Sequence, residues 1–234
     1  WERRCVDEDF LTLRVGTGQR PLAAELDYPK QGFEIERDVL KEEMYALAQK
    51  PVVLEHVPIM LSLKTDYVVG VLGFSKDSLQ AIRGLVMQLV LTHSCDEVKL
   101  VVLAGEEYAA EFDFARYLPH TWSDDRSIRF FAVNLSDALE IGEFLNGEIE
   151  AALESSENGN RQSGLPAYVI AALDKKLFDS IECLKKVLYH GEYCGVSVLA
   201  AFDGVPKECT QLIDLRAKPK LVSLAGAETE NQAF

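Results

Sequence analysis

From residue 67 onward, nearly continuous apolar runs alternate with amphipathic segments. Apolar runs of five to eight residues are typical of strands buried on both faces, whereas apolar positions three or four apart predict helices. The predicted strands are Tyr67–Leu72, Val98–Leu103, Arg129–Val133, Ala167–Leu173 and Gly195–Phe202. The predicted helices are Ser75–Thr92, Ser136–Leu153 and Leu177–Tyr189. This alternation predicts an α/β fold with a mainly parallel central sheet flanked by helices.

The first 65 residues follow a different pattern, and we interpret residues 1–65 as a short N-terminal lead-in that contains β structure. Phe10–Val15 alternates as a strand and stops at Gly16-Thr17-Gly18, a turn signal. The other predicted elements of the lead-in are a helix over Val39–Gln49 and a strand over His56–Leu63. The main domain is then predicted to span residues 66–224.

The end of the chain is predicted to be less regular. Leu212–Leu215 and Lys220–Leu224 predict short edge strands, and Ser155–Gly164 predicts a polar loop. Residues 225–234 are small and polar and are predicted to form a frayed C-terminal tail.

The net charge of the chain restricts the classes of partner that it could bind. The chain has 38 Asp and Glu against 24 Lys and Arg, a formal net charge of −14. DNA binding draws its affinity from cations on phosphates, so the acidic balance argues against a nucleic-acid partner. No run approaches the roughly 18 apolar residues of a membrane span. A start at Trp1, with no apolar leader after it, leads us to expect a fragment of a longer protein.

The first strand–helix junction contains a degenerate phosphate-loop pattern. The nucleotide-binding pattern is GxxxxGK[ST] after a strand and before a helix, where free N–H groups and the helix dipole favour phosphate. Gly70, Gly73 and Lys76 fall where this pattern needs two glycines and a lysine.

Three other positions of the same junction bear on this pattern. Ser75 replaces the glycine before the lysine and adds a side chain where the backbone must approach phosphate. Asp77 replaces the Mg²⁺-binding Ser or Thr, and its negative charge would repel phosphate. Ser78, which carries the next hydroxyl for Mg²⁺, comes one residue late. The alternative is an ordinary helix start, with Ser75 as its N-cap.

A second candidate follows the strand Ala167–Leu173. Asp174 ends this strand at the position of a Walker B aspartate, which would hold Mg²⁺ through water. Lys175 stands where a catalytic glutamate normally follows, and lysine cannot orient an attacking water as that base does. The alternative reading of Asp174 is a helix N-cap at a strand–helix turn.

Taken in order, these residues resemble the FtsK/SpoIIIE family of RecA-like P-loop motor ATPases. The resemblance covers about Val57–Leu215, with Lys76 matching the Walker A lysine and Asp174 the Walker B aspartate. The segments that carry it are Pro58–Gly73, Lys99–Ala104, Leu118–His120, Phe130–Leu153, Leu165–Ile170 and Gly191–Ala201.

More specific segments are similar to the EssC/EccC branch of this family, the membrane ATPases of type VII secretion. They are Trp1–Arg4, Asp9–Gly18, Tyr117–Trp122 and Gly204–Cys209. The resemblance implies a membrane-proximal ATPase-like module at the cytoplasmic face of a bacterial membrane. Its implied ligands are ATP and Mg²⁺. Its implied partners are other domains of the same ATPase, other secretion-machine subunits, secreted protein substrates, and further copies in a homo-hexamer of the parent protein.

Three functions remain open from the sequence. The first is a degenerate module that couples the membrane segment to active ATPase domains, indicated by the departures at Ser75, Asp77 and Lys175. The second is a genuine ATP-binding and ATP-hydrolysing domain, indicated by Lys76 and Asp174. The third is a protein-interaction module without nucleotide, indicated by the net charge and the acidic stretch from Glu140 to Glu157.

Overall fold

One mostly parallel sheet forms the centre of the main body in this computed structural model. The structure describes residues 2–24, 27, 38–48, 50, 52–73, 75–157, 166–202, 204–224 and 231–234. Within these residues, eight strands follow the order β10-β9-β8-β3-β7-β6-β4-β5. The strands are β3 (Val68–Leu72), β4 (Val98–Leu103), β5 (Phe131–Ala132), β6 (Ala167–Ala172), β7 (Val196–Ala200), β8 (Gln211–Asp214), β9 (Lys220–Ser223) and β10 (Asn231–Ala233). The run from β8 to β5 is parallel, and β9 and β10 are antiparallel additions.

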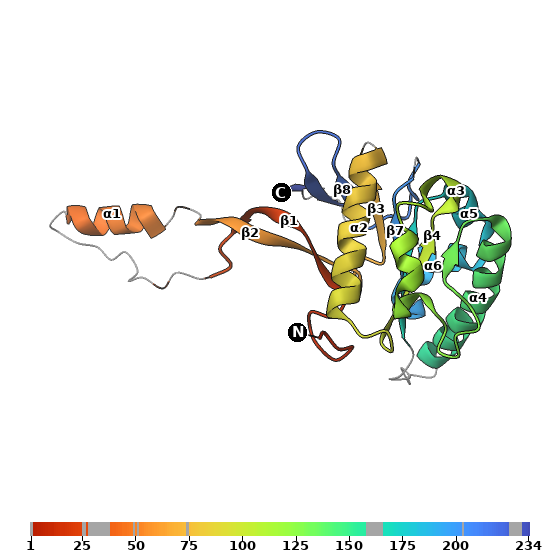
Figure 1. Cartoon of the computed structure of the whole chain (residues 1–234). Helices are drawn as coiled ribbons and strands as arrows, with labels where there is room; N and C mark the ends of the chain where they lie inside the picture. Colours follow the sequence, from red (N-terminus) through yellow and green to blue (C-terminus); the bar gives the residue numbers. More distant parts are fainter. Residues whose placement is uncertain are drawn as a thin grey trace.

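Helices cover both faces of this sheet (Figure 1). Alternate residues of each parallel strand point to opposite faces, so strands buried on both sides need apolar side chains throughout. One face packs on α2 (Ser75–Thr92), through residues such as Ile82 and Leu89. The other packs on α4 (Leu135–Glu157), α5 (Lys175–Ser180) and α6 (Cys183–Cys194). These layers confirm the predicted α/β fold.

The lead-in forms a two-stranded antiparallel ribbon of β1 (Thr12–Pro21) and β2 (Val53–Ser62). Its base belongs to the main core, because Leu13 and Leu61 are buried in the same cluster as α2. Gln88 of α2 also binds the base of the ribbon. The Gln88 side-chain amide accepts a hydrogen bond from the Arg14 N–H at 3.0 Å and donates one to the Arg14 carbonyl at 2.9 Å. The predicted boundary near residue 65 therefore does not separate two hydrophobic cores.

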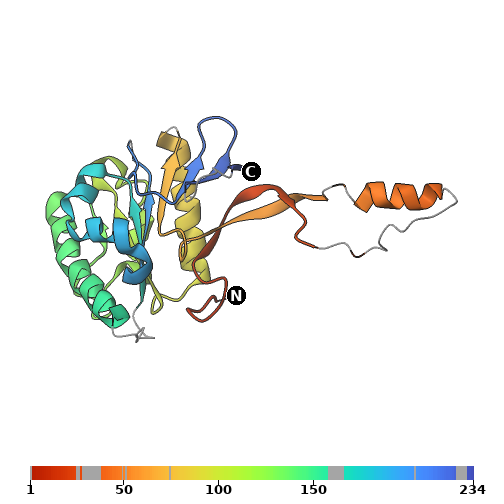
Figure 2. The same ribbon diagram turned by 180° about the vertical axis from the view of Figure 1, so that it is seen from behind.

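The outer half of the ribbon leaves the body and carries α1 (Val39–Ala48) beyond its end (Figures 1 and 2). None of the ten residues of α1 is buried. Leu40 is 77% exposed and Leu47 is 64% exposed, so apolar side chains face solvent there. We call the outer ribbon and α1 the arm, residues 18–54.

Several local predictions were wrong. Gly16-Thr17-Gly18 is not a turn: β1 continues through it with bulges, and a Cβ on Gly18 would lie 2.2 Å from the Ala233 carbonyl oxygen. Glycine here permits close backbone approach. β8 is not an edge strand, since it lies between β3 and β9.

Other element boundaries also differ from the predictions. The helix predicted over Leu177–Tyr189 is two helices, α5 and α6, which are separated by the extended residue Ile181. Ser155–Glu157 extends α4, and the rest of the predicted polar loop, 158–164, lies outside the described residues. Residues 231–233 pair with β9 instead of fraying.

Candidate functional site

The predicted phosphate loop begins inside the sheet. Gly70 lies within β3 and pairs with Ala200 of β7 on one side and Leu212 of β8 on the other. A Cβ on Gly70 would lie 2.8 Å from Leu212 Cδ1, so this glycine serves close packing between strands. Pairing with β8 continues as far as Leu72, whose partner is Asp214.

Only residues 73 and 74 connect β3 to α2. A phosphate-binding loop needs several consecutive backbone N–H groups turned toward the ligand. Here the first three positions of the pattern are strand residues. A Cβ on Gly73 would lie 2.9 Å from Ser78 Oγ and 3.2 Å from Leu215 Cβ, so side chains close this junction from two sides.

The first turn of α2 carries the remaining Walker A candidates. Ser75 begins the helix, and Lys76 and Asp77 are both exposed. Asp77 complements the positive end of the helix dipole itself. Ser78, proposed as an Mg²⁺ ligand, is only 5% exposed and lies against Gly73, so its hydroxyl does not face an open crevice.

An ion pair lies at the same edge, at the end of β8. Arg216 donates two hydrogen bonds to Asp214, from Nε to Oδ1 and from Nη2 to Oδ2, both at 2.9 Å. These bonds hold the pKa of the Asp214 carboxyl at about 2, well below its ordinary value. Because its guanidinium fork is taken up by Asp214, Arg216 is not a free phosphate ligand.

Asp174 follows β6 and acts as the N-cap of α5. Its Oδ1 accepts from the backbone N–H of Lys176 at 2.7 Å and of Leu177 at 3.3 Å. Its Oδ2 lies over Gly105, at 2.4 Å from the position of a Cβ on that residue. Gly105 has a φ of +66°, which favours glycine, and therefore leaves room for the carboxylate.

Lys175 is directed along α5. Its Nζ lies 2.5 Å from Asp179 Oδ2, one helical turn further on, and 5.9 Å from the centre of the Phe202 ring. Lys175 stands where the ATPase pattern places a glutamate, and its side chain contacts Asp179 and Phe202.

The two predicted half-sites follow β3 and β6 at the carboxyl edge of the parallel sheet. β7 lies between β3 and β6, so Asp174 and the α2 start are two strand spacings apart, roughly 10 Å. One Asp174 oxygen is used as a cap, and the Ser78 hydroxyl is buried. Elsewhere in the described chain, no group of three or more His, Cys, Asp or Glu residues is placed to hold a metal ion. The assignment of Gly70, Gly73, Ser75, Lys76, Asp77, Ser78 and Asp174 to nucleotide stays a prediction.

Sequence reasoning missed Gly105 and the Asp214–Arg216 pair at this edge. Gly105 comes two residues after the end of the apolar strand β4, which is a recognisable strand-end glycine signal. No spacing rule links Gly105 to Asp174, because the two meet only through the pairing of β4 with β6.

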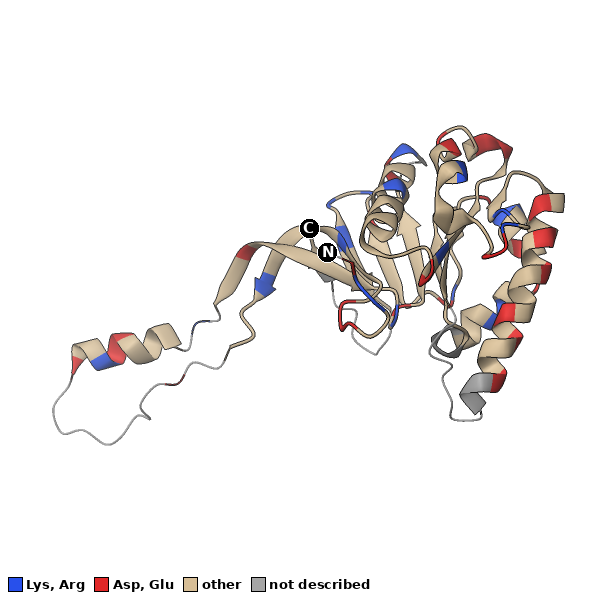
Figure 3. Ribbon diagram, turned by 60° about the horizontal axis from the view of Figure 1, so that its bottom comes forward, with Lys and Arg blue, Asp and Glu red and all other residues tan. Residues whose placement is uncertain are grey.

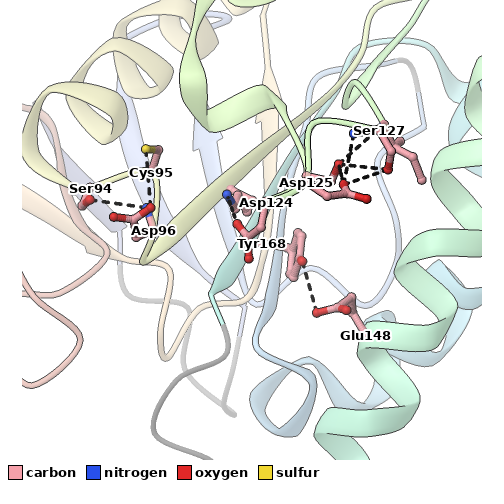
Figure 4. Close-up of polar contacts among 11 residues, drawn as sticks. Ser94, Cys95, Asp96, Asp124, Asp125, Ser127, Glu148 and Tyr168 are labelled. Carbon is pink, nitrogen blue, oxygen red and sulfur yellow. Dashed lines mark hydrogen bonds and ion pairs between the residues drawn. The ribbon is translucent and has the colours of Figure 1, made fainter.

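A further polar cluster lies near the opposite, amino-terminal ends of β4 and β6 (Figure 4). The Lys99 side chain is 5% exposed, and its Nζ lies 2.6 Å from Asp124 Oδ1. Tyr168 donates a hydrogen bond to Glu148 at 3.2 Å, and burial is the main cause that raises the pKa of this phenol. The cluster anchors the 121–130 segment to the sheet.

No family model matches the chain. It is 32% identical over 126 residues to the ESX secretion system protein EccC of Thermomonospora curvata, covering 52% of this chain and 9% of that protein. It is 22% identical over 225 residues to the type VII secretion system protein EssC of Staphylococcus aureus strain MSSA476, covering 93% of this chain and 15% of that protein. The chain thus spans a small fraction of these relatives. Among its described residues, no helix has the length and apolar character needed to cross a membrane.

Solved structures show the same fold. EssC (ATPases 2 and 3) of Geobacillus thermodenitrificans superposes with a TM-score of 0.62 at 10% identity, over 99% of this chain and 46% of that one. Thermomonospora curvata EccC (ATPases 2 and 3), in complex with a signal sequence peptide, gives 0.57 at 12% identity, over 76% and 38%. The homologues of this chain are therefore the EccC and EssC ATPases of type VII secretion systems, and its central sheet with flanking helices is the fold of their RecA-like ATPase domains.

Proposed function

We propose that this chain is a degenerate ATPase-like module of a type VII secretion motor, which couples a membrane segment to catalytically active ATPase domains of the same protein. It retains the RecA-like scaffold without turning over nucleotide itself. The parent protein acts at the cytoplasmic face of the bacterial membrane.

The position of Gly70 carries this proposal. Gly70 pairs with both β7 and β8, and Val71 and Leu72 pair with β8, so the backbone of these three loop positions takes part in strand pairing. The buried Ser78 and the capping role of Asp174 support the same conclusion. A neighbouring residue could compensate for one unsuitable side chain in a phosphate loop. No neighbour could replace the three loop positions that here belong to a strand.

The arm favours a second role, in protein interaction. No described residue of the arm is buried, and a two-stranded ribbon alone is marginally stable in water. A helix of only ten residues with no buried side chain gains little stability from packing. We propose that the arm contacts another part of the secretion machine, which would be a neighbouring domain, another subunit or a second copy in a hexamer.

A substrate role is the weaker part of the interaction hypothesis. The Thermomonospora curvata EccC structure contains a signal sequence peptide, bound to a protein that holds ATPases 2 and 3. The acidic face of α4 (Figure 3) motivates substrate contact here. Part of that acidity is used internally, because Glu150 pairs with Lys186 at 3.1 Å and Glu148 accepts from Tyr168.

Steady-state ATP hydrolysis by the isolated domain tests the proposal. We expect turnover below about 0.1 s⁻¹, against a typical 1–10³ s⁻¹ for enzymes. Lys76→Ala is the critical variant, and Lys64→Ala is its control, since Lys64 is an exposed lysine at the other end of β3. Faster turnover that is lost in Lys76→Ala and kept in Lys64→Ala would establish the active-ATPase alternative instead.

A further inference from the structure

A surface pocket of about 300 Å³ lies at the β5 edge of the sheet, away from the predicted nucleotide site. Its walls come from η1 (Asp113–Tyr117), the 121–131 segment and the first turns of α4. The charged and aromatic side chains that line it are Arg116, Trp122, Arg129, Phe131, Asp137 and Glu140. We call it the arginine pocket.

Two arginines of this pocket lie over aromatic rings. The Arg129 guanidinium carbon lies 4.4 Å from the Trp122 ring centre, and that of Arg116 lies 4.4 Å from the Phe131 ring centre. A guanidinium group that lies over an aromatic ring is attracted by the ring face and can still donate hydrogen bonds from its N–H groups.

Several contacts hold the segment that carries Trp122 and Arg129. The two residues face each other in an isolated antiparallel bridge. At the turn of this hairpin, Asp125 accepts hydrogen bonds from both Ser123 and Ser127 (Figure 4), which holds the pKa of its carboxyl at about 2. The Lys99–Asp124 ion pair ties the same turn to the sheet.

The charged residues of the pocket differ in whether they already have a partner within the protein. Arg116 Nε lies 3.1 Å from Asp113 Oδ1, and Asp137 accepts from the Val133 N–H as part of the α4 cap. Arg129 is exposed, and within the described residues no carboxylate lies within ion-pair distance of it. The pocket thus offers one stacked, uncommitted guanidinium.

The surrounding charges restrict what can bind there. Asp137 and Glu140 lie in the same pocket, so a phosphate dianion or a nucleic-acid backbone would meet two carboxylates. A single carboxylate fits better, because it pairs with the Arg129 fork while the acids accept N–H groups from the same ligand. Exposed apolar residues on the elements that form the walls, Tyr117, Leu135 and Leu139, add contact surface. Arginine and aromatic residues are enriched at protein interfaces.

We infer that the arginine pocket binds a protein segment that presents one Asp or Glu side chain among neutral, apolar or basic residues. The net charge of −14 disfavours a strongly acidic partner. The residues around the single acid of the ligand are therefore expected to be neutral, apolar or basic. The inference is independent of the proposed coupling function, since it uses neither the β3–α2 junction nor Asp174.

Nuclear magnetic resonance of the Trp122 indole N–H tests it directly. The chain has two tryptophans, so Trp1→Phe leaves Trp122 as the only indole signal. The probe is the capped peptide acetyl-Gly-Asp-Lys-Leu-amide, and the matched probe replaces its Asp with Asn. We expect saturable shifts with the Asp peptide and at least about tenfold weaker binding of the Asn peptide.

Substitutions locate the contact. Arg129→Ala is expected to weaken the Asp peptide about tenfold or more, and Arg129→Lys less, because lysine keeps the charge without the fork. Arg83→Ala is the control, since Arg83 stacks on Phe114 outside the pocket. Thermal melting of each variant checks that it is folded.

Four results would overturn the inference. They are no response to the Asp peptide at millimolar concentration, equal binding of the Asp and Asn peptides, unchanged binding by folded Arg129→Ala, and a response to inorganic phosphate alone. The last result would define a simple anion site. None of these outcomes alters the expectation for ATP hydrolysis, so the two proposals fail separately.

Discussion

At the scale of single residues, Gly105 determines where Asp174 lies. The carboxylate occupies the volume that any Cβ at position 105 would need, and the backbone there is left-handed. The capping of α5 therefore depends on a glycine almost seventy positions earlier in the chain. In this arrangement Asp174 caps α5.

Gly105→Ala is predicted to destabilise the protein by about 2–4 kcal/mol, because it adds left-handed strain and pushes the Asp174 carboxylate off its cap. Gly84→Ala is the matched control. Gly84 lies in α2 with no atom within 4 Å of its added Cβ, so alanine should stabilise the helix by about 0.5–1 kcal/mol. Urea unfolding measures both. Equal stabilities for the two variants would show that Gly105 does not support Asp174.

At the scale of elements, the two halves of the β1–β2 ribbon have different roles. The inner half belongs to the core, as Leu61 is 1% exposed, while the arm contributes no buried side chain from α1. The ribbon thus extends from the body, and α1 lies beyond its outer end (Figures 1 and 2).

Replacing residues 22–52 by Asn-Gly tests this division. Pro21 pairs with Val53, and a two-residue Asn-Gly turn closes such a pair. We predict a change in unfolding free energy below about 1 kcal/mol, or a melting temperature within about 2–4 °C of the original. Leu61→Ala, in the inner half, should instead destabilise by about 2–5 kcal/mol. A large loss of stability on removing the arm would mean that it supports the fold.

Sequence patterns predicted elements well wherever the environment was uniform. β4 and α2 have the predicted ends, because one is apolar throughout and the other is strictly amphipathic. The patterns failed where contacts with a distant segment determine the local structure. Gly16-Thr17-Gly18 has turn composition but passes close to Ala233, and Ile181 breaks a helix without Pro or Gly nearby. No local signal marks either feature.

At the scale of the whole molecule, the predicted fold was right and the predicted site could only be placed by the structure. Periodicity identifies strands and helices, yet the register between β3 and β8 decides whether Gly70 belongs to a loop or to a strand. That register depends on residues some 140 positions apart. A motif match at the β3–α2 junction was therefore compatible with both a phosphate loop and a plain strand–helix turn.

We propose that this RecA-like scaffold does not bind nucleotide. Isothermal titration calorimetry with Mg·ATP at millimolar concentration tests it most directly, on the folded chain beside its Lys76→Ala variant. We predict no saturable heat with either protein, because Gly70–Leu72 pair with β8, Ser78 is buried and Asp174 caps α5. Saturable binding by the original chain, lost in Lys76→Ala, would contradict the account.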